Sequence, residues 1–222
     1  MKRWLGLALL GLLISLPLWV GGVYYINLAS QIMIAALFAI SLNLLVGYAG
    51  LTSLGHAGYL GLSAYTSAWL MTHLGWGHLA SAGAALAGTV AMAAVFGLIA
   101  LRATGISFLM ITLALGQILW GLAYRWTSVT GGDNGISGLT RPSPFGVDLD
   151  NASNFYFFTL VVFVLIWSVS AIWVRSPFGA SIRGTKDQPR RMSALGYNVW
   201  LIRWITFIVS GLMGAVAGLM YV

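Results

Sequence analysis

Long apolar stretches separated by shorter polar ones dominate the pattern of this chain. Each is close to the length of about 20 residues that a helix needs to cross a bilayer. They run over about 4–25, 26–46, 57–74, 79–101, 106–124, 155–174 and from 199 to the last residue. Only helices and closed barrels satisfy their backbone groups in lipid. We therefore predict an all-α fold, a polytopic transmembrane helix bundle with about seven membrane helices.

The first apolar stretch allows a second interpretation. It follows Lys2 and Arg3, and its short basic start and Leu-rich middle also fit a secretory signal peptide. It has no small-x-small cleavage site and continues directly into more membrane sequence, which favours a retained first helix.

The charged residues between the stretches predict the orientation of the chain. One side of the predicted bundle holds most of the basic residues: Lys2 and Arg3, Arg102 and the strongly basic loop 175–198. The other side holds loop 126–154, which contains three Asp residues. Basic loops face the cytoplasm in membrane proteins. We expect a cytoplasmic N-terminus, an extracytoplasmic loop at 126–154 and a cytoplasmic loop at 175–198.

Composition supports a membrane protein and narrows its chemistry. Of 222 residues, 59% are hydrophobic and 7% are charged, whereas soluble domains carry about 25% charged residues. This leaves one transmembrane domain over residues 1–222 and no separate soluble domain. There is no Cys and no Glu, and all four acidic residues are Asp outside the apolar stretches. An ion-driven carrier usually keeps an ionisable residue inside the membrane, so this pattern argues against one.

Enzyme motifs are absent from the sequence. His56, His73 and His78 do not stand in a metal-ligand spacing, and the segment 179–186 misses the phosphate-loop pattern because its Lys comes one place late. We predict no catalytic residue, no cofactor and no metal site.

The segment 47–56 interrupts the apolar pattern with Gly, Thr, Ser and His. It is either an ordinary inner turn with a hydrogen-bonded His56 or a broken helix that lines a pathway, since irregular backbone at membrane depth is tolerated only where protein or water covers it. Candidate pathway-lining residues are Asn43, Ser53, His56, Thr112 and Gln117. Interhelical packing is the alternative role for each of them.

A short helix is predicted over 187–196 within the basic loop. Asp187 is its expected N-cap, Pro189 lies in its first turn and Gly196 follows its end. A helix of about two turns needs a surface to dock on. Its docking residues would be Arg190, Arg191, Met192, Leu195 and Gly196. The alternative is a basic interfacial loop that only fixes topology.

Small residues recur at helical spacing in two stretches, which predicts close helix packing within the bundle or, as the alternative, a subunit interface. They are Ala80, Ala84, Gly88 and Ala91, and Ser210, Gly214 and Gly218.

Four segments resemble the permease subunits of branched-chain amino acid ABC importers. They are LTSLGHAGYLGLSAYT at 51–66, ISFLMITLALGQ at 106–117, TGGDNG at 130–135 and SPFG at 176–179. The resemblance implies a bacterial inner-membrane subunit that pairs with a second permease, two cytoplasmic ATPases and an extracytoplasmic solute-binding protein. The ATPases would hydrolyse ATP, and the subunit itself would not be an enzyme. Urea and short-chain amide importers share the pattern.

Two departures accompany the resemblance. Importer permeases often carry Glu-Ala-Ala-x-x-x-Gly in the ATPase-docking loop, but here Arg190, Arg191 and Met192 stand at the triplet and only Gly196 is retained. Family members are also longer, and the expectation is that the chain is C-terminally incomplete. Two rival functions remain open: a self-sufficient secondary carrier or channel, and a non-transporting membrane scaffold.

Overall fold

A computed structural model describes residues 11–17, 19, 22–139 and 148–222 of the chain. The predicted first stretch, 4–25, therefore lies partly outside the described residues, as does the middle of loop 126–154. Residues 11–17 are helical, and every regular element in the described ranges is a helix. The predicted all-α fold is confirmed to this extent.

The long helices follow the apolar stretches closely. They are α2 Val23–Asn43, α3 Ala57–Leu74, α4 His78–Ala100, α5 Ile106–Arg125, α7 Ala152–Arg175 and α10 Val199–Leu219. A π-helix, η1 Leu44–Tyr48, continues α2, and the short elements α6 Thr127–Thr130 and η2 Gly132–Asn134 follow α5. Among the described residues, five segments are long and apolar enough to cross a membrane: 23–48, α4, α5, α7 and α10. The more polar α3 does not meet this measure, and a count of seven stays a prediction.

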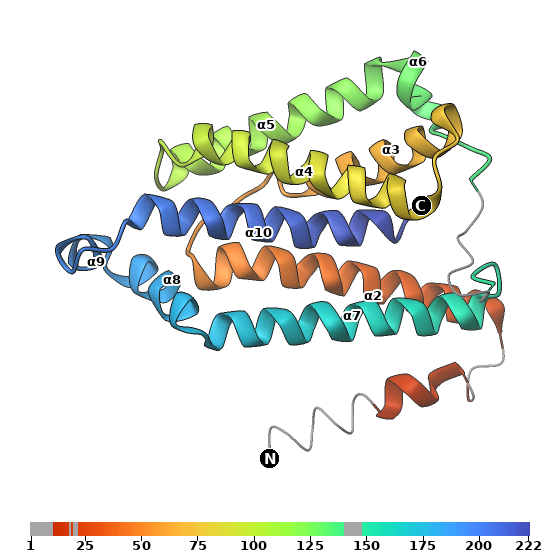
Figure 1. The fold of residues 1–222 in the computed structure, drawn as a ribbon, viewed down its shortest axis with the longest axis horizontal. Coiled ribbons are helices and arrows are strands. Elements are labelled where there is room, and N and C mark those ends of the chain that lie inside the picture. Colours follow the sequence, from red (N-terminus) through yellow and green to blue (C-terminus); the bar gives the residue numbers. More distant parts are fainter. Residues whose placement is uncertain (1–10, 18, 20–21, 140–147) are drawn as a thin grey trace.

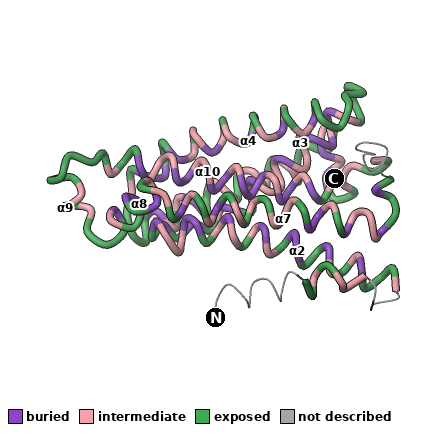
Figure 2. Tube along the Cα trace, turned by 60° about the horizontal axis from the view of Figure 1, so that its bottom comes forward, coloured by how far each residue is buried: buried purple, intermediate pink, exposed green. Residues whose placement is uncertain are grey.

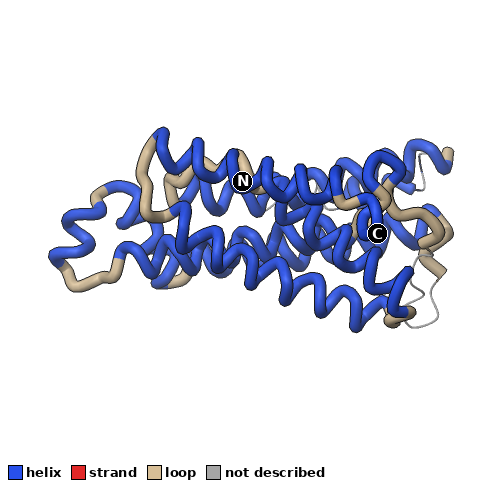
Figure 3. The backbone as a smooth tube through the Cα atoms, turned by 90° about the horizontal axis from the view of Figure 1, so that it is seen from above, coloured by secondary structure: helices blue, strands red, loops and turns tan. Residues whose placement is uncertain are grey.

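Helix α10 lies at the centre of the bundle (Figure 1). It packs against α2, α3 and α4, while α7 lies along α2. Helix α5 packs mainly on α3 and α4, and its Phe108 also contacts Phe207 of α10. The burial colouring reflects this arrangement, with purple positions along α10 and more green on the outer helices (Figure 2). Seen from above, the helices run lengthwise in one elongated bundle (Figure 3). The broad apolar exposure of the outer helices suits a lipid environment.

The two predicted sides of the membrane correspond to opposite ends of the bundle. The turn after α4 and the elements between α7 and α10 lie at one end, and α6 lies at the other (Figure 1). Leu45, Leu101 and Ile182 belong to one buried cluster, which ties three chain segments together at the first end. Which end faces the cytoplasm stays a prediction.

The two small-residue stripes have different outcomes. In α10, Ser210, Gly214 and Gly218 are buried against α2 and α3, as the packing prediction requires. In α4 the predicted packing within the bundle was wrong, because Ala80, Gly88 and Ala91 are exposed in the single chain, and a subunit interface at this stripe stays a prediction. The buried stripe is shifted by one or two residues, to Ser81, Ala85, Thr89, Ala93 and Gly97. Both stripes consist of small residues, so residue size could not distinguish them.

The loop predicted over 175–198 is largely helical. It contains α8 Pro177–Asp187 and α9 Pro189–Ala194, joined at Gln188. The expected N-cap role of Asp187 was wrong because Asp187 ends α8, and Gln188 stands at the N-cap position of α9 without a side-chain cap. The predicted short helix is therefore six residues long and begins at Pro189, with Leu195 at its C-cap.

Candidate functional site

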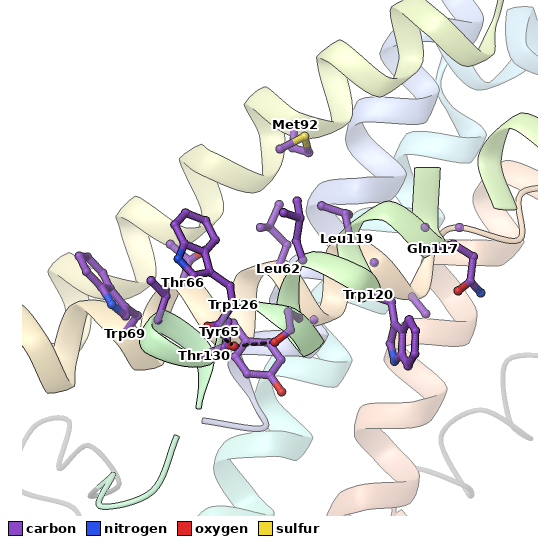
Figure 4. A pocket seen from close by; sticks show the side chains of 18 of the residues that line it. Leu62, Tyr65, Thr66, Trp69, Met92, Gln117, Leu119, Trp120, Trp126 and Thr130 are labelled. Atoms are coloured by element: carbon purple, nitrogen blue, oxygen red, sulfur yellow. Dashed lines mark hydrogen bonds between the residues drawn. The ribbon is translucent and has the colours of Figure 1, made fainter. Parts of the chain in front are cut away.

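A cavity of about 570 Å³ lies between α3 and α5. Met92 of α4 closes one side, and residues of α6 close the end near the 126–139 segment. Figure 4 shows its side chains, with Leu62 and Leu119 reaching in from α3 and α5. We call this cavity the α3–α5 groove. It is large enough for a small metabolite, because ligand sites commonly occupy about 300–1,000 Å³.

The walls of the groove are aromatic and uncharged. Four aromatic side chains line it: Tyr65, Trp69, Trp120 and Trp126. Thr66, Gln117 and Thr130 add polar groups, and none of the described lining residues carries a fixed charge. Trp69 stacks on His73 with the two ring centroids 5.3 Å apart, and Trp120 stacks on Tyr124 with the centroids 5.2 Å apart. Such a surface favours an apolar or aromatic group over an ion, since burying an unpaired charge is costly.

An unwound segment, residues 49–56, forms one end of the groove through Leu54 and Gly55. We call this the inner end, and Trp126 and Thr130 line the opposite end. The Leu54 N–H donates to Thr112 Oγ1 (3.2 Å) on α5, and that hydroxyl donates to the Leu109 carbonyl (2.9 Å). Gly55 lies directly against α5, where an added Cβ would collide with the Thr112 carbonyl. The Gly residue thus allows the backbone of 49–56 to touch the backbone of α5.

His56 closes the unwound segment on its other side. Its Nε2 lies 3.0 Å from Ser41 Oγ on α2 and 3.3 Å from Ser210 Oγ on α10. The Ser41 hydroxyl donates to the Phe38 carbonyl (2.6 Å), and the Ser210 hydroxyl donates to the Ser41 carbonyl (2.6 Å). The tautomer of the His56 ring sets which group donates in these two contacts. His56 is 2% exposed and fastens the start of α3 between two helices.

The predicted pathway residues separate into three locations. Gln117 lines the groove, and Thr112 holds its inner end in place. Ser53 and His56 are buried behind that end, in the same unwound segment. Asn43 is exposed near the end of α2, with its side chain lying over Gly47.

Sequence reasoning missed the aromatic wall because it searched for polar residues. Tyr65 and Trp69 are four residues apart on α3, a spacing that places them on one helix face and could have pointed to the groove. Within the described residues, no group of three or more His, Cys, Asp or Glu side chains could hold a metal ion.

The predicted docking residues lie at the opposite end of the bundle from α6 (Figure 1). Leu195 is 68% exposed, and Arg190 and Arg191 are also exposed. Met192 does not share this exposure, because it is half-buried against Gly184 of α8.

Gly196 terminates α9 as predicted. It has a φ of +88°, which suits Gly. The Gly196 N–H donates to the Ser193 carbonyl (3.0 Å), and the Tyr197 N–H donates to the Met192 carbonyl (3.1 Å). This pair of bonds is a Schellman motif, which fixes how Leu195 and Tyr197 are presented to solvent.

The sequence Ser-Pro-Phe-Gly at 176–179 forms the corner between α7 and α8. The Ser176 hydroxyl donates to the Trp173 carbonyl (2.6 Å) and accepts from the Gly179 N–H (3.2 Å), which caps α8. Any Cβ at Gly179 would collide with the Val174 carbonyl. The Arg183 guanidinium donates to that same carbonyl (2.9 Å), so α8 is held firmly to the end of α7.

Comparison with known proteins gives a consistent family. The family described as "Branched-chain amino acid transport system / permease component" matches residues 24–222. The high-affinity branched-chain amino acid transport system permease proteins LivM of Salmonella typhimurium and Escherichia coli are each 29% identical over 221 residues, covering 88% of this chain and 52% of the relative. The chain thus spans about half the length of these curated relatives.

A shorter similarity extends to a different solute class. The nucleoside ABC transporter permease protein NupC of Lactococcus lactis subsp. cremoris is 34% identical over 65 residues, covering 29% of this chain and 20% of the relative. No solved structure matches the chain.

Proposed function

The chain belongs to the family of permease components of branched-chain amino acid transport systems, and we propose from this that it is the membrane-spanning subunit of an ATP-driven importer. It catalyses no covalent reaction. Separate cytoplasmic ATPases hydrolyse ATP, a second permease subunit completes the membrane unit, and an extracytoplasmic binding protein delivers the solute. The protein resides in a bacterial inner membrane with its N-terminus in the cytoplasm.

The α3–α5 groove is the proposed solute path. The main support is that unwound backbone lines its inner end. The groove runs from Trp126 and Thr130 to the unwound segment at Leu54 and Gly55. Unwound backbone inside a membrane bundle is tolerated where it lines a cavity, and broken helices form the solute sites of many transporters. Within the described chain, the groove is where unwound backbone and a cavity of ligand size occur together.

The proposed solute is a branched-chain amino acid. Its aliphatic side chain would contact the aromatic wall formed by Tyr65, Trp69 and Trp126. Its ammonium and carboxylate groups partly compensate each other's charge but need hydrogen-bonding partners. Groups that can hydrogen-bond are present at Thr66 and Gln117. A short-chain amide or urea is the alternative solute.

The α9 segment is the proposed ATPase contact. Its six-residue helix has no buried residue, and Leu195 and Tyr197 expose apolar surface beside Arg190 and Arg191. Such a combination of an apolar anchor and peripheral cations is typical of interfaces, in which a few buried residues supply most of the affinity.

The groove can be tested by filling it. An added Cβ at Gly61 of α3 meets no atom within 4 Å, and Gly61 lines the groove. Gly61→Leu therefore places a side chain in the path without a collision at its Cβ. The matched control is Gly83→Leu in α4, where an added Cβ also meets nothing within 4 Å and the position lies outside the groove.

The measurement is ATP-dependent leucine uptake into vesicles that contain the full-length permease pair, the ATPases and the binding protein. We expect uptake to fall about tenfold or more with Gly61→Leu, a barrier change of about 1.4 kcal/mol, and to stay at the wild-type rate with Gly83→Leu. Equal uptake by the two variants would exclude this groove as the path. Flux through the isolated subunit without ATP would instead support the carrier alternative.

A further inference from the structure

Helix α8 is packed into the bundle rather than lying on its surface. Ser181, Ile182 and Thr185 are buried, and Ile182 belongs to the same buried cluster as Leu45 and Leu51. These two Leu residues flank the end of the π-helix η1. Apolar packing therefore already places α8 against the point where α2 stops being helical.

Lys186 adds a polar link between α8 and this point. Its Nζ donates to the Gly47 carbonyl (2.7 Å). Gly47 is the second-last residue of η1, and carbonyls in the last turn of a helix lack intrahelical partners and attract cations. The methylene groups of the Lys186 side chain cover Gly50, whose φ is +68°. One side chain thus contacts both the end of η1 and the first residues of the unwound segment.

Helix α10 holds α8 from the other side. Arg203 of α10 donates from its NH2 group to the Thr185 carbonyl (3.0 Å), one residue before Lys186. The C-terminal turn of α8 is therefore fixed between α10 and η1 by two cations that each bind a main-chain carbonyl.

The unwound segment continues this link to the groove. It leads from Gly50 to Gly55, where Leu54 is bonded to Thr112 and Gly55 rests on the backbone of α5. The segment is thus held at both ends, by Lys186 at Gly47 and by α5 at Leu54 and Gly55.

We infer that Lys186 is the positioning residue that couples α8 to the inner end of the groove. This inference rests on the proposed function: the ATPases move α8 and α9, Lys186 passes the movement of α8 to Gly47, and the unwound segment changes the inner end of the solute path. Without the ammonium group, the ATPases still bind and hydrolyse ATP, but their movement no longer displaces the segment efficiently.

The test replaces the ammonium group and keeps the packing. Lys186→Met retains the apolar contact over Gly50 and removes the donor, whereas Lys186→Arg retains a cationic donor. The control is Arg175→Met, which removes an exposed cation at the end of α7. The full transporter in vesicles is assayed for ATPase co-purification, basal ATP hydrolysis, and solute transported per ATP hydrolysed.

We expect Lys186→Met to retain co-purification and basal hydrolysis and to lower the transport-to-ATP ratio about tenfold, which corresponds to about 1.4 kcal/mol of coupling. Lys186→Arg should recover most of the ratio, and Arg175→Met should not change it. An unchanged ratio with Lys186→Met overturns the inference, as does loss of assembly, which would make the contact purely architectural. If the wild-type complex shows no ATP-dependent uptake, the proposed function fails instead.

Discussion

Replacing Gly116 by Ala tests whether the unwound segment really lies against α5. A Cβ at Gly116 would stand 2.7 Å from the Gly55 Cα, closer than two carbon atoms can approach. The two backbones must then separate by about 1 Å to reach the normal contact distance of about 3.5–4.0 Å. That movement would lengthen the bond from the Leu54 N–H to Thr112 Oγ1, which is 3.2 Å long.

Gly121 provides the matched control in the same helix. An added Cβ at Gly121 meets no atom within 4 Å. Both changes replace Gly by Ala within α5, so both gain about 0.5–1 kcal/mol in helix propensity. The difference between the two variants therefore isolates the collision at Gly55.

The expected difference follows from the contact. Inserting a methyl group into a packed site costs about 1–3 kcal/mol, and losing one hydrogen bond costs about 0.5–1.5 kcal/mol. Partial relaxation of the segment will reduce the sum, so we expect Gly116→Ala to be about 2 kcal/mol less stable than Gly121→Ala. For a protein of this size, such a difference lowers the unfolding temperature by about 4–8 °C.

Thermal unfolding of each purified variant in detergent, followed by tryptophan fluorescence, measures the difference. Uptake by the assembled transporter is a second measurement, because a displaced segment would alter the inner end of the groove. If Gly116→Ala and Gly121→Ala unfold at the same temperature, the backbone contact between Gly55 and Gly116 does not exist as described.

Two further predictions concern the end of the bundle that contains α9. Leu195→Asp should lower co-purification of the ATPases about tenfold, because it would bury an unpaired carboxylate at the interface. Arg191→Gln should have a much smaller effect, because peripheral charges mainly tune association. If the ATPases co-purify with Leu195→Asp as well as with the wild type, α9 has only a topology-setting role. The second prediction concerns orientation and uses single Cys residues at the exposed positions Ser137 and Ser193. An impermeant thiol reagent applied to intact cells should label the Cys at 137 and not the Cys at 193. The reverse pattern would invert the proposed orientation.

The long helices could be predicted from sequence because their signal is strong. Continuous apolar stretches located α4, α5, α7 and α10 to within a few residues. Helix α8 was missed because its sequence is polar and contains Gly179 and Gly184, which disfavour helix. Its stability comes from contacts that no local pattern reveals, including the buried Ile182.

The candidate site was only partly predictable for a related reason. Polarity inside an apolar stretch singled out Thr112 and Gln117, which the structure places at the groove. Polarity also singled out His56, which lies behind the groove in contact with Ser41 and Ser210. A hydrogen-bonding side chain in a membrane bundle serves packing as readily as transport, so composition alone could not separate the two uses.

Three of the cations at the α8 end of the bundle share one kind of acceptor. Arg183, Lys186 and Arg203 each donate to a main-chain carbonyl, and none of these bonds needs an acidic side chain. A carbonyl persists whatever side chain stands at its residue, so the acceptor positions can vary in sequence while the bonds remain. Exchanging charges between partners, the usual test of an ion pair, has no second side chain to act on here. Only the identities of the three donor side chains therefore determine whether these hydrogen bonds can form.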